Sequence, residues 1–253
     1  MMINQIKELI HSVVAEIKKE KRKILSAEKK DISLSTDKYI NDRIASFLKN
    51  SFPYPVLSEE NDIKTNYLNY DQCFWILDPL DGTLNYSRDI PLSCISIALW
   101  RKQQPVLGMI YDINHDEMYI GVLENELGLT AGVWKNNAEI SVSNTEKINT
   151  GILSTGFPSW RNYERESLYS FILLVQQWKK IRLVGSAALS LAWVASGRFD
   201  AYIEEDIRIW DVAAGLALVK AAGGDILCIP GKRENFVTAI ATNGIIKAKD
   251  LLP

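Results

Sequence analysis

The chain has 253 residues, and 47% of them are hydrophobic, which is enough for one large core or two tightly joined lobes. No apolar run reaches the roughly 20 residues that a membrane span requires, so we expect no transmembrane helix and no membrane partner. The formal net charge is −2, with acids and bases interleaved, which argues against a sequence-independent nucleic-acid binder.

The three cysteines, Cys73, Cys94 and Cys228, are widely spaced and lie mostly inside apolar runs. This pattern indicates buried free thiols and not disulfides or a zinc site. The N-terminus carries no signal-like pattern, so we expect the chain in a reducing cytoplasm. His11 and His115 fall in no motif and are expected at the surface, so histidine ligation of a metal is not predicted.

Apolar residues repeat at helical spacing from the start of the chain, at Ile3, Ile6, Ile10, Val13 and Ile17. They predict a packing helix that ends in the basic run 18–23, a charge that a helix C-terminus favours. A second helical pattern follows Asp37, with apolar residues at Ile40, Ile44, Phe47 and Leu48. Asp37 is therefore expected to cap this helix, an interpretation that carries equal weight with a role in a site.

The most informative segment ends a buried strand, predicted over Phe74–Leu77, with two carboxylates around a proline. Pro79 fixes φ and lacks an N–H group, so the chain is expected to leave the sheet where Asp78 and Asp81 appear. Hard cations such as Mg²⁺ prefer oxygen ligands, and this turn offers two carboxylates and the carbonyl oxygen of Leu80. The segment therefore predicts a cation site.

The two residues after this turn, Gly82 and Thr83, leave backbone N–H groups free to meet an anion. Taken alone, Asp-Pro-x-Asp-Gly is an ordinary turn. Two other acidic sites favour a metal site instead. Asp211 follows an apolar run and is expected to be the N-cap of a helix, and residues 58–60 read Ser-Glu-Glu.

Between and after these acids, three strand-like runs are predicted at residues 92–100, 106–111 and 117–122. Their alternation of large and small residues predicts a sheet that is covered on at least one face. Residues 163–180 are predicted to be helical. Ser186 is expected to cap another helix, which closes at Gly197, and residues 200–204 are expected to form a short strand that leads toward Asp211.

Together these motifs resemble the inositol monophosphatase family of Mg²⁺-dependent, lithium-sensitive phosphatases. The resemblance runs from about Asp31 to the C-terminus and rests on the motifs at residues 35–37, 58–60, 78–85, 154–158, 182–188, 197–200, 210–215 and 222–224. It implies a mixed α/β chain with the layered αβαβα sugar-phosphatase fold. By the same resemblance, an N-terminal lobe of residues 1–150 carries most metal ligands, a lobe of residues 151–253 completes the site, and the protein is a homodimer.

The resemblance also assigns ligands, in a site that holds two or three Mg²⁺ ions. Glu59, Asp78 and the Leu80 carbonyl match the first metal position, while Asp78, Asp81 and Asp211 match the second. Glu59 and Thr83 match the pair that polarises the attacking water, and the amides of Gly82 and Thr83 match the groups that hold phosphate oxygens. Asp37 matches the acid near a weaker third metal position.

For the substrate, the resemblance implies that Asp81, Asp211, Glu204 and Ala188 line the pocket, with Glu204 contacting hydroxyl groups. The alternative for Glu204 is a solvated charge at a strand end. Several positions depart from the family pattern. Leu84 and Leu34 stand at positions that are often Thr in the family, which weakens the prediction of a third metal position. Asp206 and Arg208 also differ from the family pattern, so the residues of the pocket rim are not predicted.

The sequence thus predicts a Mg²⁺-dependent phosphomonoesterase that acts on a small phosphorylated polyol or sugar, with inositol 1-phosphate as the leading candidate. Metal-activated water is the expected nucleophile, without a covalent enzyme intermediate. A 3′(2′),5′-bisphosphate nucleotidase is the first alternative. The second is a regulatory binding protein on the same fold that engages the transcription machinery.

Overall fold

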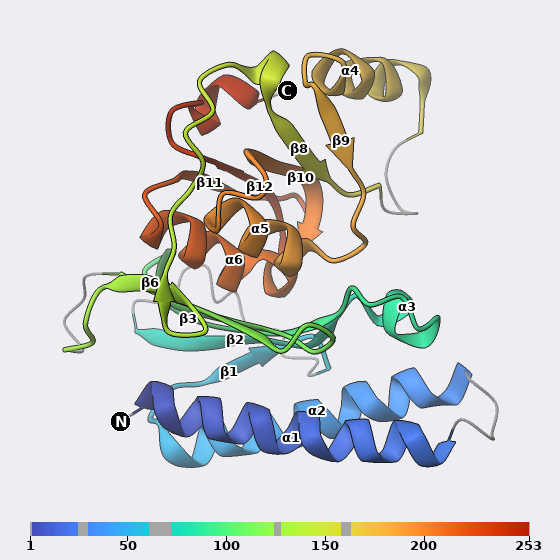
Figure 1. Ribbon diagram of the computed structural model, residues 1–253, viewed down its shortest axis with the longest axis vertical. Coiled ribbons are helices and arrows are strands. Elements are labelled where there is room, and N and C mark those ends of the chain that lie inside the picture. The colour runs from blue at the N-terminus through green and yellow to red at the C-terminus, as the bar shows by residue number, and fades with distance from the viewer. Residues whose placement is uncertain (1, 25–29, 61–71, 124–127, 158–162, 253) are drawn as a thin grey trace.

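The computed structural model describes residues 2–24, 30–60, 72–123, 128–157 and 163–252, without the side chains of residues 20–24 and 30–34. Three expectations cannot be placed on the described part of the chain, because they concern the side chain of Leu34, the side chains of residues 20–23 in the basic run, and Pro158 of the motif 154–158. Figure 1 shows five layers. A pair of helices, a seven-stranded sheet, a second pair of helices, a five-stranded sheet and one further helix follow one another, which confirms the αβαβα prediction.

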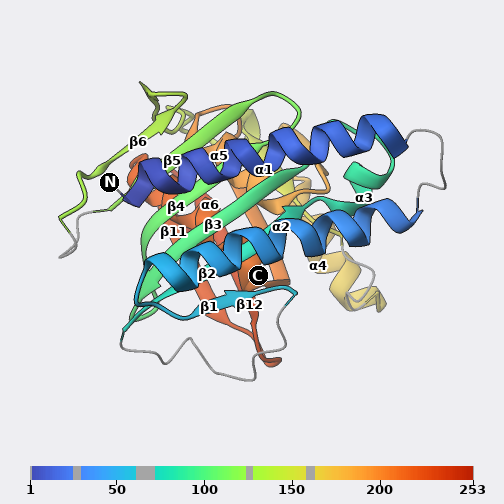
Figure 2. The same cartoon turned by 90° about the horizontal axis from the view of Figure 1, so that it is seen from below.

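The outermost layer consists of α1 (Met2–Ile24) and α2 (Lys30–Ser51), which lie across one face of the larger sheet in Figure 2. The predicted apolar stripe of α1 is buried, since Ile6, Ile10 and Val13 have no exposed surface. It packs with the stripe of α2 against the sheet. The prediction for α2 was wrong in one respect. The helix begins at Lys30, so Asp37 lies inside it and is not its N-cap.

The larger sheet follows chain order from β1 to β7, and all neighbours except the parallel pair β1 and β2 are antiparallel where they pair. Its strands are β1 (Val56–Ser58), β2 (Cys73–Asp81), β3 (Cys94–Arg101), β4 (Gln104–Asp112), β5 (Glu117–Val122), β6 (Gly132–Lys135) and β7 (Ala138–Glu139). The three predicted strands are confirmed as β3, β4 and β5. Both faces are covered, because Ile97 packs toward α1 and α2 while Ala98 packs toward the opposite layer.

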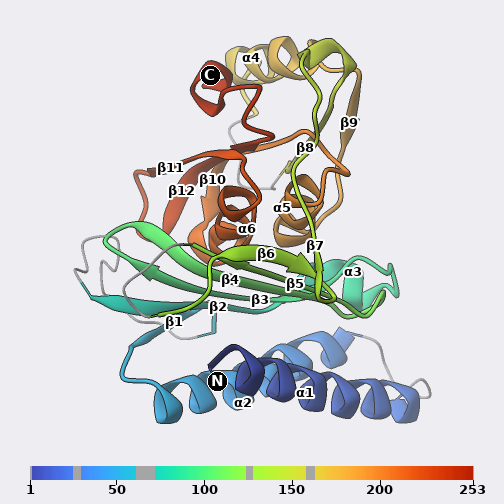
Figure 3. The same cartoon turned by 60° about the vertical axis from the view of Figure 1, so that its left-hand side comes forward.

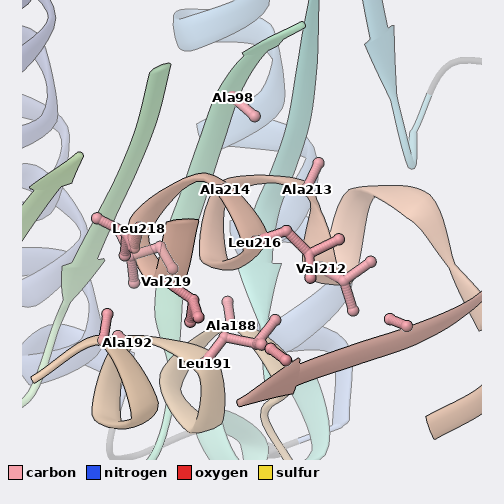
Figure 4. Close-up of a cluster of buried hydrophobic side chains, with 14 of the residues drawn as sticks. Ala98, Ala188, Leu191, Ala192, Val212, Ala213, Ala214, Leu216, Leu218 and Val219 are labelled. Carbon is pink, nitrogen blue, oxygen red and sulfur yellow. The ribbon is translucent and has the colours of Figure 1, made fainter. Parts of the chain in front are cut away.

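That opposite layer consists of α5 (Ala187–Ala195) and α6 (Ile209–Ala221), which lie between the two sheets in Figure 3. Small residues let the layers approach closely. A Cβ atom at Gly108 of β4 would lie 2.2 Å from the carbonyl oxygen of Ala214 in α6. Figure 4 shows the side chains of the two helices, among them Leu191, Val212 and Leu216, gathered in this central core.

The smaller sheet has the order β11, β12, β10, β8, β9. Helix α4 (Arg165–Val175) lies on its outer side in Figure 1. Its strands are β8 (Ile152–Thr155), β9 (Lys180–Arg182), β10 (Ala201–Arg208), β11 (Asp225–Pro230) and β12 (Phe236–Thr242). Short helices are α3 (Thr83–Ser87) and the 3-10 turns Ile148–Thr150 and Ala248–Leu251. The helix predicted over 163–180 is shorter, since α4 is Arg165–Val175 and residues from Lys180 pair with β8 instead.

Other expectations from the sequence can be placed on this fold. Ser186 caps α5 by accepting a hydrogen bond from the Leu189 amide, as predicted. All three cysteines are free thiols, with Cys73 and Cys94 buried and Cys228 half-buried. None of the described helices is both long and apolar enough to cross a membrane. The first sheet ends at Glu139 and the second begins at Ile152, on either side of the predicted lobe boundary at 150.

Candidate active site

The site begins at a bulge in β2 and not at its end. Asp78 pairs with Ser96 and Asp81 pairs with Cys94, and the register shifts between them. The expectation that Pro79 takes the chain out of the sheet was therefore wrong. Proline cannot donate to the ladder, and the strand accommodates it by an irregular register. Asp78 and Asp81 lie on either side of this irregularity, and both side chains are buried.

The turn after the bulge is held tightly against the neighbouring chain. Gly82 has φ of 84°, and a Cβ atom there would lie 2.6 Å from the Leu92 carbonyl oxygen, so only glycine fits. The Thr83 hydroxyl donates to the carbonyl oxygen of Leu80 at 2.9 Å. The Thr83 hydroxyl also lowers the pKa of the nearby Asp37 carboxyl group.

Asp81 is fixed by the N-terminal end of α5. Its Oδ2 atom accepts hydrogen bonds from the Ser186 hydroxyl at 2.6 Å and from the Ala188 amide at 2.7 Å, and the Cys94 thiol lies 3.8 Å away. Burial raises the pKa of Asp81 to about 6, against the effect of these hydrogen bonds, which favour its charged form. One oxygen of Asp81 is thus anchored by protein donors.

Asp78 and Asp211 form the centre of the acid cluster. Asp211 is the third residue of α6, and the N-cap is Arg208, so the capping role expected for Asp211 was wrong. Asp78 accepts a hydrogen bond from the Leu80 amide at 3.1 Å, and its proximity to Glu59 and Asp211 affects the pKa of both. Burial first, and then the neighbouring carboxylates, raise the pKa of both aspartates well above the usual range. Such pairs hold protons because like charges so close together are unfavourable.

Asp37 and Glu59 extend the cluster. Asp37 lies inside α2, is 5% exposed, and its Oδ1 atom has no hydrogen-bond partner. Burial and the charges of Glu59 and Glu60 raise the pKa of Asp37 to about 8. Glu59 is exposed as a residue, yet partial burial of its carboxyl group and the charges of Glu60 and Asp81 raise its pKa to about 7.

This donor set fits a hard divalent cation in its chemistry. Its members are carboxylates, held close enough to raise one another's pKa, and the orphaned oxygen of Asp37 is a buried acceptor without a donor. Within the described part of the chain, no three His, Cys, Asp or Glu side chains approach one point closely enough to hold an ion as they stand. Ligation therefore requires small side-chain rotations toward a common centre, which a cation would favour by removing the repulsion.

A cavity of about 370 Å³ lies beside Asp81 and Asp211. Its other lining residues are Leu84, Thr155, Gly156, Phe157, Gly185, Ser186, Ala187, Ser190, Tyr202, Glu204 and Ile207. Ala188 is fully buried in the central core, so the pocket contact expected from it is made by its neighbours Ser186 and Ala187. The acid cluster and the cavity thus share two carboxylates.

Glu204 is part of the cavity wall and is only 7% exposed, so the alternative of a solvated strand-end charge does not hold. Its Oε2 atom accepts a hydrogen bond from the Tyr202 hydroxyl at 2.7 Å. A Cβ atom at Gly156 would lie 1.9 Å from that oxygen, so glycine provides the space that the carboxylate fills. Sequence reasoning gave no site role to Tyr202 or Gly156, although Gly156 stands in a motif that resembles the family.

Asp206 and Arg208, the two positions that depart from the family pattern, flank Ile207 of the cavity wall. Asp206 has φ of 58° at an irregularity of β10, a backbone conformation that favours glycine. The Arg208 guanidinium lies 4.0 Å from the ring centre of Phe236 and 5.1 Å from that of Trp210. Its charge lowers the pKa of Glu59 and so partly opposes the carboxylates around it.

Known proteins resemble this chain along nearly its whole length. The profile of the inositol monophosphatase family matches residues 2–252. The Nus factor SuhB of Xylella fastidiosa is 37% identical over 210 residues, which cover 82% of this chain and 73% of the relative. An inositol-1-monophosphatase of Synechocystis is 32% identical over 220 residues, or 85% and 74% of the two chains. The solved inositol monophosphatase of Anabaena superposes with a TM-score of 0.77 at 31% identity, covering 96% and 90%.

Proposed function

The chain belongs to the inositol monophosphatase family and is a phosphoric monoester hydrolase, and from this premise we propose that it hydrolyses a small polyol or sugar phosphate with Mg²⁺. Inositol 1-phosphate is the leading candidate substrate. The observation that carries the proposal is the joining of a buried acid cluster to a cavity whose far wall contains Glu204. One part suits a cation and a phosphate group, and the other suits hydroxyl groups.

The family is generally metal-dependent, and the identity and number of the ions belong to the proposal. Glu59, Asp78 and the Leu80 carbonyl would hold one Mg²⁺, and Asp78, Asp81 and Asp211 a second, with Asp37 near a third. When bound, such ions lower the pKa of water and stabilise a developing alkoxide. The raised pKa values of these acids mean that protons leave the cluster as cations enter it.

The chain's own residues orient the reactants. The Thr83 hydroxyl donates to Leu80, so its lone pairs can accept a hydrogen bond from the attacking water on the side of Glu59. Glu59 would take up the proton of that water as a general base. The amides of Gly82 and Thr83 hold the phosphate oxygens. No side chain is required to form a covalent bond with the phosphoryl group.

The leaving group occupies the cavity beyond Asp81 and Asp211. Glu204 accepts hydrogen bonds from its hydroxyl groups, and Tyr202 keeps the carboxylate in place. None of the described residues that line the cavity is Lys or Arg, which suits a leaving group that is bound through its hydroxyl groups.

A hydrolysis screen tests the proposal. We expect Mg²⁺-dependent release of phosphate from inositol 1-phosphate with a higher kcat/KM than from adenosine 3′,5′-bisphosphate. The reverse order would assign the chain to the nucleotidase branch. If the folded protein hydrolyses neither substrate at saturating Mg²⁺, the proposed activity is contradicted.

A regulatory binding role is the second candidate, because a relative at 37% identity is named a Nus factor. The partner would then be part of the transcription machinery. Co-purification of RNA polymerase with the wild-type chain and equally with Asp81→Asn would support such a role beside catalysis. No association with polymerase would remove it.

We also propose a homodimer. Apolar side chains are exposed on α4 at Tyr169 and Ile172, which are 64% and 52% exposed, and Leu183 nearby in the chain is 64% exposed. Apolar side chains gathered at a surface favour association with another protein surface. Sedimentation equilibrium is expected to give twice the chain mass, and a monomer at micromolar concentration would contradict this part of the proposal.

A further inference from the structure

Asn85 joins three segments of the chain through one side-chain amide. Its Nδ2 atom lies 2.9 Å from the carbonyl oxygen of Leu92, 3.0 Å from that of Val184 and 3.2 Å from that of Gly185. An amide group has two N–H bonds, so one of them is shared between two carbonyls. All three partners are backbone atoms, and they fix the course of the chain at this point.

These carbonyls come from both halves of the molecule. Leu92 precedes β3 in the first half, while Val184 and Gly185 precede α5 in the second, about 100 residues later in the chain. The junction is tight. Gly185 has φ of 71°, and a Cβ atom on it would lie 3.0 Å from Nδ2 of Asn85. A Cβ atom on Gly82 would lie 2.6 Å from the Leu92 carbonyl oxygen and 3.4 Å from that of Gly185.

The segment that Asn85 holds leads directly to the donors of Asp81. Ser186, the next residue after Gly185, donates its hydroxyl proton to Asp81 Oδ2 at 2.6 Å, and the Ala188 amide donates at 2.7 Å. A shift of Gly185 would move both donors together. The orientation of Asp81 toward the cavity therefore depends on the position of this segment.

We propose that Asn85 is a positioning residue, which clamps the segment 184–186 onto the turn 82–92 so that Asp81 keeps one fixed orientation in the acid cluster. The kinetic part of this inference rests on the proposed function, whereas its structural part does not. Asn85 itself lies outside the residues that line the cavity, so it acts through Asp81 and not on the substrate.

The substitution Asn85→Asp tests the clamp, because it keeps the size of the side chain and replaces the donor by an oxygen that faces three carbonyls. In the protein without added cation, we expect amide hydrogen exchange in residues 184–190 to be at least about tenfold faster. With Mg²⁺ added, the Mg²⁺ concentration for half-maximal activity is expected to rise at least about tenfold.

Ser87→Ala is the matched control. Ser87 lies in the same short helix and donates to the Leu84 carbonyl at 2.8 Å, so its bond stays within α3. We expect neither the exchange of residues 184–190 nor the Mg²⁺ requirement to change in this variant. If Asn85→Asp fails to fold, Asn85→Ala removes the donor without adding charge and is measured in the same way.

The outcomes separate three explanations. A folded variant with lower thermal stability but unchanged exchange at residues 184–190 and an unchanged Mg²⁺ requirement would overturn the proposal and leave Asn85 a purely structural residue. Faster exchange together with the higher Mg²⁺ requirement would support it. If the wild-type chain hydrolyses no ester, the proposed function fails, and the exchange measurement alone then decides whether Asn85 holds the segment.

Discussion

Adding one methyl group at Gly156 is expected to displace Glu204 and to reduce the recognition of polyol substrates. The Cβ atom of Gly156→Ala would lie 1.9 Å from Oε2 of Glu204 and 2.2 Å from its Cδ and Oε1 atoms. Ordinary van der Waals contact begins near 3.4 Å, so the carboxylate must move by more than about 1 Å. That movement breaks its 2.7 Å hydrogen bond with the Tyr202 hydroxyl.

The magnitude follows from the bonds that Glu204 makes. A hydrogen bond to a charged acceptor contributes about 1.5–3 kcal/mol, which corresponds to about 10- to 150-fold in kcat/KM. We expect a loss of that size for inositol 1-phosphate in Gly156→Ala and in Glu204→Gln. Because both substitutions act through the same carboxylate, the double variant should be no worse than the poorer single variant.

The assay compares inositol 1-phosphate with p-nitrophenyl phosphate, an ester without hydroxyl groups, whose turnover should barely change. Gly151→Ala, just before β8, is the control for crowding at another place, since its added Cβ atom would lie 3.0 Å from the Trp178 ring and does not approach Glu204. Equal losses for both esters would mean that Glu204 acts on the acid cluster. A folded Gly156→Ala with full activity toward inositol 1-phosphate would refute the argument from close contact.

Four further outcomes are expected. Asp81→Asn should lower Mg²⁺-dependent hydrolysis by several orders of magnitude in a folded protein, because an amide supplies no anionic oxygen, and near-normal turnover would contradict the ligand role. Thr83→Ala should lower kcat more than it raises KM, since its hydroxyl faces the water, and steady-state kinetics that show only a higher KM would make it a substrate contact. Millimolar lithium should inhibit, nearly uncompetitively with substrate, and insensitivity would indicate a lithium-resistant branch. Burial alone would raise the pKa of Glu117, but hydrogen bonds from Arg198, Tyr119 and Lys135 outweigh it and lower that pKa to about 2. Glu117 therefore stabilises the fold above about pH 4.5 and loses that effect as pH falls toward 2. Urea unfolding of Glu117→Gln should therefore show a loss of about 1–2 kcal/mol at pH 7 that shrinks near pH 4, and a constant difference would contradict the ion-pair explanation.

Periodic patterns in the sequence predicted individual helices and strands well, whereas the layered arrangement was predicted from the family resemblance. The apolar stripe of α1 and the strands β3 to β5 were found from spacing alone, since burial of one face or both leaves a regular signal. Element ends were predicted less well. The C-terminal end of α4 and the start of α2 depend on pairing with β8 and on packing, which local sequence does not encode.

The site shows the same division. The acids of the cluster were named from motifs, but two of them, Asp37 and Asp211, were also assigned capping roles, because an acid before an apolar pattern has the same local signature in either case. Distant partners left no signal of their own. The contacts from Ser186 to Asp81 and from Gly156 to Glu204 join residues 105 and 48 positions apart, and only the folded chain brings them together.

The placement of α6 limits how this protein can move. The helix belongs to the second half of the chain, yet its backbone lies against β4 of the first sheet, where even a Cβ atom at Gly108 would find no space. Its first turn carries Asp211 into the acid cluster. A hinge motion that separated the two halves would have to separate α6 from the larger sheet and remove Asp211 from the acid cluster. We therefore expect substrate entry and product release to occur by local movements near the cavity, while the two sheets keep their relative position.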